Sequence, residues 1–177
     1  MSAINRKSTL KDVAMIVCKA LKEAGIDAVL SGGAVVSIYS ENRYMSYDLD
    51  FISQGKSKEI ERVMKGLGFT RTPSRYYEHP ETDFFVEFPT PPLAIGSHPI
   101  DTFEEIETEN GYLKMLTPTH CVMDRLAAFY HWNDRQALEQ ALLVAGLNAV
   151  DMKEIEGWSI AEGMVEKFMK FKEMLKD

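Results

Sequence analysis

The stretches SGGAVVSIY at positions 31–39 and SYDLDFI at positions 46–52, separated by a polar turn, decide the fold of this chain. The apolar residues 27–30 just before them predict a strand that runs into the glycine pair. Residues 34 to about 40 are apolar enough to begin a helix, and residues 47–53 predict the next strand. Backbone amides at such a strand-to-helix junction suit a phosphate group.

Two acids alternate in the second stretch, Asp48 and Asp50. Because side chains alternate between the two faces of a strand, both acids project from one face. Their apolar neighbours Leu49, Phe51 and Ile52 are expected in the core. A solvated strand face or a helix-capping turn are alternatives, but these apolar neighbours favour a strand that enters the core. Two adjacent carboxylates can hold a divalent cation.

A third acid comes from the stretch DFFVEF at positions 83–88. Alternation places Asp83 and Glu87 on the same face of this predicted strand, so that either acid can face the first pair. We prefer Glu87, because apolar neighbours anchor it in a central strand, whereas Asp83 lies nearer the turn; an exposed edge charge is the alternative. Three carboxylates around Mg²⁺ are what phosphoryl or nucleotidyl transfer needs, with Asp48, Asp50 and Glu87 as the metal ligands.

The other hydrophobic patterns predict helices around a mixed β-sheet, which is an α+β fold. The first part of the chain predicts a helix over 10–24 ended by Gly25, a helix over 56–67, short antiparallel strands over 69–72, 76–78 and 83–88, and a hairpin of 103–107 with 112–116.

From Pro118 onward the pattern is helical. The expected helices run over 118–132, from a cap at Asn133 or Asp134 to Gly146, and onward from a cap at Asp151 or Ser159, with Ile160, Met164, Phe168, Phe171 and Leu175 as the terminal buried face. We therefore divide the chain into an α/β core, residues 1–116, and a C-terminal helical region, residues 117–177, packed on that core.

Composition fits one compact protein of enzyme size: 177 residues, of which 45% are hydrophobic. Residues 1–11 are polar, without the apolar stretch of a signal peptide, and no window approaches a membrane span, so we expect a soluble, cytoplasmic protein. The two cysteines, Cys18 and Cys121, are expected to be buried and reduced. The formal net charge of -7 argues against a nonspecific nucleic-acid coat.

A glycine pair at a strand-to-helix turn, an Asp-Leu-Asp on the next strand and a later strand acid resemble the nucleotidyltransferase superfamily of the DNA polymerase β type. The resemblance is strongest to the minimal prokaryotic nucleotidyltransferases, including the AbiEii-like toxins of toxin–antitoxin systems, and covers roughly residues 27–140. It implies a nucleotidyltransferase-like mixed sheet with flanking helices, followed by a C-terminal helical region. It also implies Mg²⁺ as cofactor and an NTP as co-substrate.

The resemblance assigns further residues. It implies that Ser31, Gly32 and Gly33 bind the nucleotide phosphates, that Arg125 contacts the nucleotide, and that Asp134 is a helical acid acting as a base or site organiser. Many relatives have Gly-Ser at the turn, whereas here Ala34 follows the glycines. The expected lysine is replaced by Arg125, which keeps the charge but presents a planar fork.

The resulting prediction is an Mg²⁺-dependent nucleotidyltransferase that moves a nucleoside monophosphate from an NTP to an RNA, protein or small-molecule hydroxyl. A place in a toxin–antitoxin system with a cognate partner and a homodimer are further expectations, and no membrane partner is expected. The Met-rich terminal helix is expected to fill gaps in a core or in a dimer face. The alternative is a non-catalytic nucleotide- or partner-binding protein on the same fold. The four histidines are too scattered along the sequence to predict a zinc site.

Overall fold

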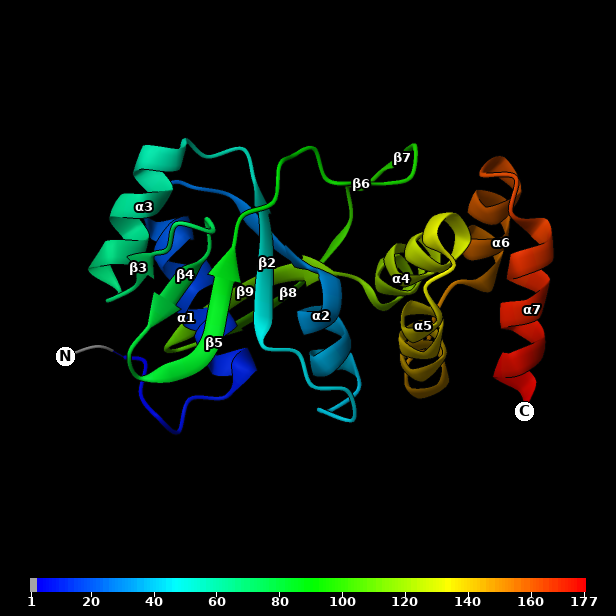
Figure 1. Cartoon of the computed structure of the whole chain (residues 1–177), viewed down its shortest axis with the longest axis horizontal. Coiled ribbons are helices and arrows are strands. Elements are labelled where there is room, and N and C mark those ends of the chain that lie inside the picture. Colours follow the sequence, from blue (N-terminus) through cyan, green and yellow to red (C-terminus); the bar gives the residue numbers. More distant parts are fainter. Residues whose placement is uncertain (1–2) are drawn as a thin grey trace. The chain divides into compact units, whose positions relative to one another are not determined.

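The computed structural model describes residues 3–177 and has the predicted α+β fold, with a mixed seven-stranded sheet (Figure 1). The strands are β1 (Ala28–Ser31), β2 (Asp48–Ser53), β3 (Thr70–Arg71), β4 (Tyr77–His79), β5 (Thr82–Glu87), β6 (Ala94–Ile95), β7 (His98–Pro99), β8 (Phe103–Thr108) and β9 (Gly111–Leu116). The helices are α1 (Leu10–Glu23), α2 (Gly32–Tyr39), α3 (Ser57–Gly66), α4 (Pro118–Trp132), α5 (Arg135–Leu147), α6 (Met152–Ala161) and α7 (Val165–Lys176).

The chain forms two compact units, which we describe separately. The first contains the chain up to Ala34, Met45–Pro92 and Phe103–Met115. The second contains Val35–Tyr44, Leu93–Thr102 and Leu116–Asp177. The second unit therefore includes two segments that the sequence analysis placed in the α/β core, and the packing of residues 117–177 on that core stays a prediction.

The sheet has the strand order β3-β4-β5-β2-β1-β9-β8. Strands β1 and β2 are antiparallel, although helix α2 lies between them in the sequence. Strand β2 is parallel to β5, and β1 is parallel to β9. The antiparallel pairs β3–β4 and β4–β5 form the predicted meander. The strands at the centre of the sheet are thus β5, β2 and β1.

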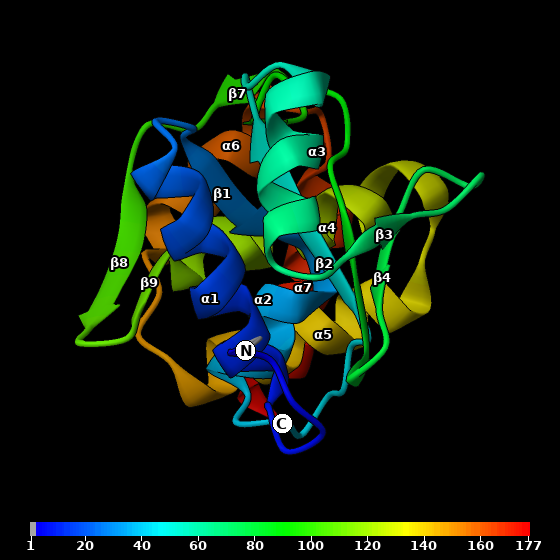
Figure 2. The same cartoon turned by 90° about the vertical axis from the view of Figure 1, so that its left-hand side faces the viewer.

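Helix α1 covers the sheet of the first unit, as its apolar spacing predicts. It begins with a capping box in which the Thr9 side chain accepts from the Asp12 backbone and the Asp12 side chain accepts from the Thr9 backbone. Its inward face is almost fully excluded from solvent, and this face comprises Leu10, Val13, Val17 and Leu21. Figure 2 shows α1 and α3 side by side on one face of the sheet.

In the second unit α4 and α5 pack against each other (Figure 1). Helix α4 begins at Pro118, as predicted, with Thr117 as its N-cap, and it ends where Asn133 adopts a left-handed conformation. Asp134, one of the two expected caps, is the N-cap of α5. Across residues 3–177, every helix is too short or too polar to cross a membrane.

The terminal segment differs from the prediction in one respect. Asp151 caps α6, whereas Ser159 lies inside that helix and donates to the Ile155 carbonyl. Gly163, with φ +71°, then separates α6 from α7. Phe168 is buried as predicted, but the expectation that Ile160 shares its buried face is wrong, since Ile160 is 57% exposed. The break changes the helical phase, so spacing counted across it does not define one face.

Candidate nucleotide and metal site

The side chains of β2 alternate between a buried and a more open face of the sheet. Leu49 and Phe51 are fully buried, while Asp48 is exposed and Asp50 half-buried. Ile52, which we expected in the core, shares the face of the acids and is half-buried. Both aspartates therefore project from the more open face.

Strand register places Glu87 directly beside Asp50, on the same face of the sheet as both aspartates. Asp50 lies opposite Glu87 on the neighbouring strand β5, and Asp48 lies opposite Phe85. On the other side of β2, Asp50 lies opposite Ser31 of β1. Paired residues on adjacent strands point to the same face. We call Asp48, Asp50 and Glu87 the acidic row.

Asp83, the alternative third acid, lies at the beginning of β5. It is exposed and precedes Glu87 by four residues, which at the usual strand rise of about 3.3 Å per residue is roughly 13 Å along the strand. The register therefore puts Glu87, and not Asp83, beside Asp50.

The glycine pair lies directly against the acidic row. Gly32 begins α2 with φ +69°, a conformation that disfavours side chains, and a Cβ at this position would lie 2.8 Å from Asp50 Oδ2. A larger residue here would have to displace the Asp50 carboxylate. Ser31 is almost buried and its hydroxyl donates to the Asp50 carbonyl oxygen over 3.3 Å. Ala34, which follows Gly33, is fully buried.

Arg125 and Asp134, the other residues that the resemblance singled out, belong to the second unit. The Arg125 guanidinium donates to Asp124 Oδ2 over 2.6 Å and 3.1 Å, and to Gln140 Oε1 of α5 over 3.3 Å. Asp134 is exposed and accepts from the Ala137 backbone N–H over 3.0 Å as the cap of α5. The observed contact of Asp134 is therefore that of a helix cap, and it provides no evidence for a role in a site.

Comparison with known proteins rests on structure alone, because neither a family model nor a curated protein sequence matches the chain. The structure is similar to the crystal structure of an antigenic nucleotidyltransferase-like protein from Paracoccidioides brasiliensis. The TM-score is 0.63 at 14% identity, over 98% of this chain and 95% of that one. The chain has a nucleotidyltransferase-like fold.

Two structures of the antibiotic-resistance factor ANT(2'')-Ia are also similar to this nucleotidyltransferase-like chain. Its solution structure gives a TM-score of 0.46 at 15% identity over 90% of this chain and 91% of that one. Its crystal structure in complex with adenylyl-2''-tobramycin gives 0.49 at 14% identity over 88% and 94%. At these TM-scores neither match is used to assign a property to this chain.

The acidic row of this nucleotidyltransferase-like chain offers hard oxygen ligands only, as Mg²⁺ prefers. Its three carboxylates are not all within 4.8 Å of one another. Within residues 3–177, a different set of three side chains meets that distance. Mg²⁺ is usually held by one or two carboxylates together with water and substrate phosphates. The row thus supplies the ligand type that Mg²⁺ prefers, without bringing all three carboxylates to one point.

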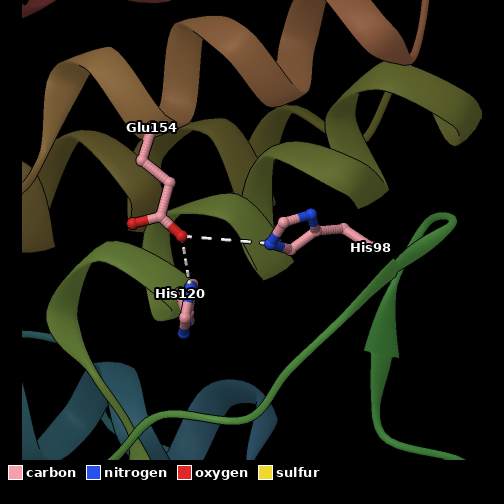
Figure 3. Close-up of side chains that lie close together, drawn as sticks. All are labelled: His98, His120 and Glu154. Carbon is pink, nitrogen blue, oxygen red and sulfur yellow. Dashed lines mark hydrogen bonds and ion pairs between the residues drawn. The ribbon is translucent and has the colours of Figure 1, made fainter.

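The converging group is His98, His120 and Glu154, which we call the histidine–glutamate cluster (Figure 3). Its members come from β7, α4 and α6 of the second unit. The expectation that the histidines form no metal-ligand group overlooked it, because spacing along the chain says nothing about contacts between such distant segments. No local pattern in the sequence marks these three residues as neighbours.

The two cysteines are free and buried, as expected. Burial raises the pKa of the Cys121 thiol far above its usual range, and burial likewise raises the pKa of Cys18. A thiol with a raised pKa is a poor nucleophile because the thiolate is the reactive form. The structure therefore offers no activated thiol at either position.

Proposed function

We propose that this chain is a nucleotidyltransferase that moves a nucleoside monophosphate from an NTP to a hydroxyl acceptor. The observation that carries the proposal is the acidic row: three carboxylates on one face of two neighbouring strands, with Asp50 paired in register with Glu87 and packed closely against Gly32. The nucleotidyltransferase-like fold supports it at the level of architecture.

In this proposal Asp48 and Asp50 hold Mg²⁺ and Glu87 completes the set of ligands. Bound Mg²⁺ would neutralise the triphosphate charge and lower the pKa of the attacking hydroxyl. Glu87 also helps to position or activate the acceptor, because it is half-buried on an interior strand and so has a restricted orientation. The partial exposure of the row leaves space for a substrate on the same face.

The phosphates would lie at the beginning of α2. Backbone N–H groups at a helix N-terminus favour negative charge, and Gly32 and Gly33 allow a phosphate to approach the backbone closely. Ser31 already donates its hydroxyl proton to the Asp50 carbonyl, so we assign it the task of fixing β1 against β2 beside the site. The backbone amides then take the place of the serine hydroxyl that many relatives have after the glycines.

Arg125 is the proposed nucleotide contact. Its guanidinium is held by Asp124 and Gln140, and the ion pair with Asp124 would have to open or be shared for Arg125 to contact a nucleotide. Asp134 supports this arrangement indirectly, since it caps the helix that carries Gln140. We therefore propose for Asp134 the role of a site organiser instead of that of a base.

The acceptor is an RNA, a protein or a small molecule with a hydroxyl group. The net charge of -7 disfavours nonspecific RNA binding and leaves a local contact to one RNA open. The membership of the AbiEii-like group, the toxin–antitoxin role with a cognate partner, the homodimer and the cytoplasmic location stay predictions.

The test is transfer of label from α-labelled NTPs, in Mg²⁺, to three acceptor classes: RNA, protein and small-molecule hydroxyls. We expect label transfer by the wild-type chain and its loss in the Asp48→Ala, Asp50→Ala double variant, with Asp83→Ala as a matched control. Absence of transfer by the wild type to all three classes would refute the proposal, as would equal transfer by the double variant.

Calorimetry combined with the transfer assay distinguishes the proposed enzyme from the non-catalytic alternative. A protein that only binds a nucleotide on this fold would show Mg²⁺-dependent NTP binding with no label transfer and no pyrophosphate release. The proposed enzyme would show both binding and transfer.

A further inference from the structure

The histidine–glutamate cluster lies outside the acidic row and has no part in the proposed nucleotidyl transfer. We propose that His98, His120 and Glu154 form a binding site for a divalent transition-metal ion, with Zn²⁺ as the ion that fits best. The proposal rests on the second unit alone and does not depend on the proposed function.

The ligand atoms are close to the spacing that a metal ion requires. His120 Nε2 lies 2.7 Å from Glu154 Oε1, and His98 Nε2 lies 3.9 Å from the same oxygen (Figure 3). Zinc–ligand bonds of about 2.0–2.2 Å in a tetrahedron put neighbouring ligand atoms roughly 3.3–3.5 Å apart. One observed separation is shorter and the other longer, so side-chain shifts of roughly 0.4–0.8 Å would bring these two separations to the values that the ion requires.

The ligand types select a transition metal. Two imidazoles and one carboxylate form a set that zinc uses when it keeps a fourth position open, whereas Mg²⁺ prefers oxygen ligands only. The cluster and the acidic row therefore differ in chemistry as well as in place.

His98 is held in position without any metal. It lies on the small hairpin of β6 and β7, which is fixed to α6 and its C-cap by three hydrogen bonds, one of them from the Ser97 hydroxyl to Glu162 Oε1 over 3.1 Å. The Ser97 backbone N–H donates to Glu162 Oε1 over 3.0 Å, and the Trp158 indole N–H donates to the Ile95 carbonyl over 3.2 Å. Trp158 is itself buried. The hairpin thus holds His98 in reach of Glu154 before an ion binds, which lowers the cost of binding.

The cluster is open on one side. His120 is 5% exposed, but His98 is 43% and Glu154 36% exposed in their side chains. A cavity of about 230 Å³ borders His98, Glu154 and Trp158. A metal ion therefore has a route of entry, and a water molecule or a small ligand has room in a fourth position.

One feature limits the expected affinity. His120 Nδ1 is buried and has no hydrogen-bond partner in the described chain. When Nε2 binds a metal, Nδ1 must carry the proton, and metal-binding histidines normally donate that proton to an acceptor. The missing acceptor should weaken binding by roughly 10–100-fold relative to a site with a complete set of such partners.

The test uses the full chain without a histidine tag, treated with a chelator and then dialysed. We expect calorimetry to show binding of one Zn²⁺ per chain, and Co²⁺ to give visible absorption bands of a low-symmetry, four- or five-coordinate site. His98→Asn and Glu154→Gln, each at a partly exposed position, should each weaken Zn²⁺ binding at least about 10-fold. Glu156→Gln is the matched control for Glu154→Gln, because Glu156 is an exposed acid on the same helix α6 and is not a member of the cluster.

Circular dichroism of the metal-free variants verifies that they fold. Absence of Zn²⁺ binding by the folded wild type would overturn the proposal. Binding that survives both His98→Asn and Glu154→Gln, or that Glu156→Gln weakens equally, would overturn it too, because the ion would then bind elsewhere.

Discussion

The acidic row and the histidine–glutamate cluster each gather three candidate metal ligands, but they are built in different ways. The acidic row lies on two adjacent strands, where backbone hydrogen bonds set which residues are level. The cluster joins a hairpin and two helices through side-chain contacts. A row fixed by backbone register should be disrupted only by substitutions of its own residues or of the glycine in direct contact with them. A cluster fixed by side chains should also be disrupted by substitutions of residues that do not touch it.

The largest expected effect is the difference between substitutions of the two acids of β5, Glu87 and Asp83. Glu87→Gln should lower the rate of nucleotidyl transfer about 100-fold, since removing a metal ligand forfeits several kcal/mol of charge stabilisation. Asp83→Asn should change the rate less than about two-fold, because Asp83 is exposed and not level with Asp50. Steady-state transfer assays on both variants measure the ratio, and equal losses would show that register does not define the site.

Gly32→Ala should have the next largest effect. The new Cβ would displace the Asp50 carboxylate and force a left-handed conformation on alanine, which costs about 1–2 kcal/mol. We expect transfer to fall about 10-fold or more, together with a lower free energy of unfolding.

The control for this substitution is Gly146→Ala. Gly146 lies in helix α5 with open space around its Cα, so alanine there should leave the free energy of unfolding unchanged or raise it by up to about 1 kcal/mol. Undiminished transfer by the Gly32→Ala variant would show that the glycine turn does not contribute to the activity of the acidic row.

The acidic row could be predicted from sequence because its information is local. Alternation along a strand assigned faces to Asp48, Asp50 and Glu87, and apolar neighbours identified the strands themselves. The close approach of Gly32 to Asp50 could not be predicted, since it depends on the antiparallel pairing of β1 with β2 around an intervening helix.

A smaller effect should reach the cluster from a distance. Trp158→Phe keeps the aromatic ring that stacks on Tyr130 but leaves the Ile95 carbonyl without its donor. We expect the free energy of unfolding to fall by about 1–2 kcal/mol and Zn²⁺ binding to weaken about 3–10-fold. Transfer should stay within about two-fold of wild type. A loss of transfer as large as the loss of Zn²⁺ binding would contradict the claim that the acidic row and the cluster are independent sites.

The smallest effect is a pH dependence confined to the second unit. Burial raises the pKa of Tyr130 from 10.0 to about 12, although its hydrogen bond with Ser159 opposes the shift. The resulting stabilisation is complete below pH 10 and is lost as the pH rises through 12. We expect the difference in unfolding free energy between wild type and Tyr130→Phe to shrink by about 1 kcal/mol between pH 7 and pH 11. A constant difference in urea unfolding would contradict this.

The cluster could not be predicted because it depends on three segments that only the tertiary fold brings together. The two-residue strands around Gly96 carry no hydrophobic period, so the hairpin that bears His98 was not expected. The same limit explains Ile160: the break at Gly163 interrupts the helical period that the prediction extended through it. Asp134 was expected at a cap and at a site, and the structure shows the cap.

Calorimetric binding of a non-hydrolysable NTP with and without Mg²⁺ tests the central claim most directly, because it requires no knowledge of the acceptor. The wild type should bind the nucleotide at least about 10-fold more tightly with Mg²⁺. The Asp48→Asn, Asp50→Asn double variant should lose that gain, and the His98→Asn, Glu154→Gln double variant should keep it. Binding that ignores Mg²⁺, or a gain that survives in the aspartate variant, would contradict the assignment of the acidic row as the nucleotide site.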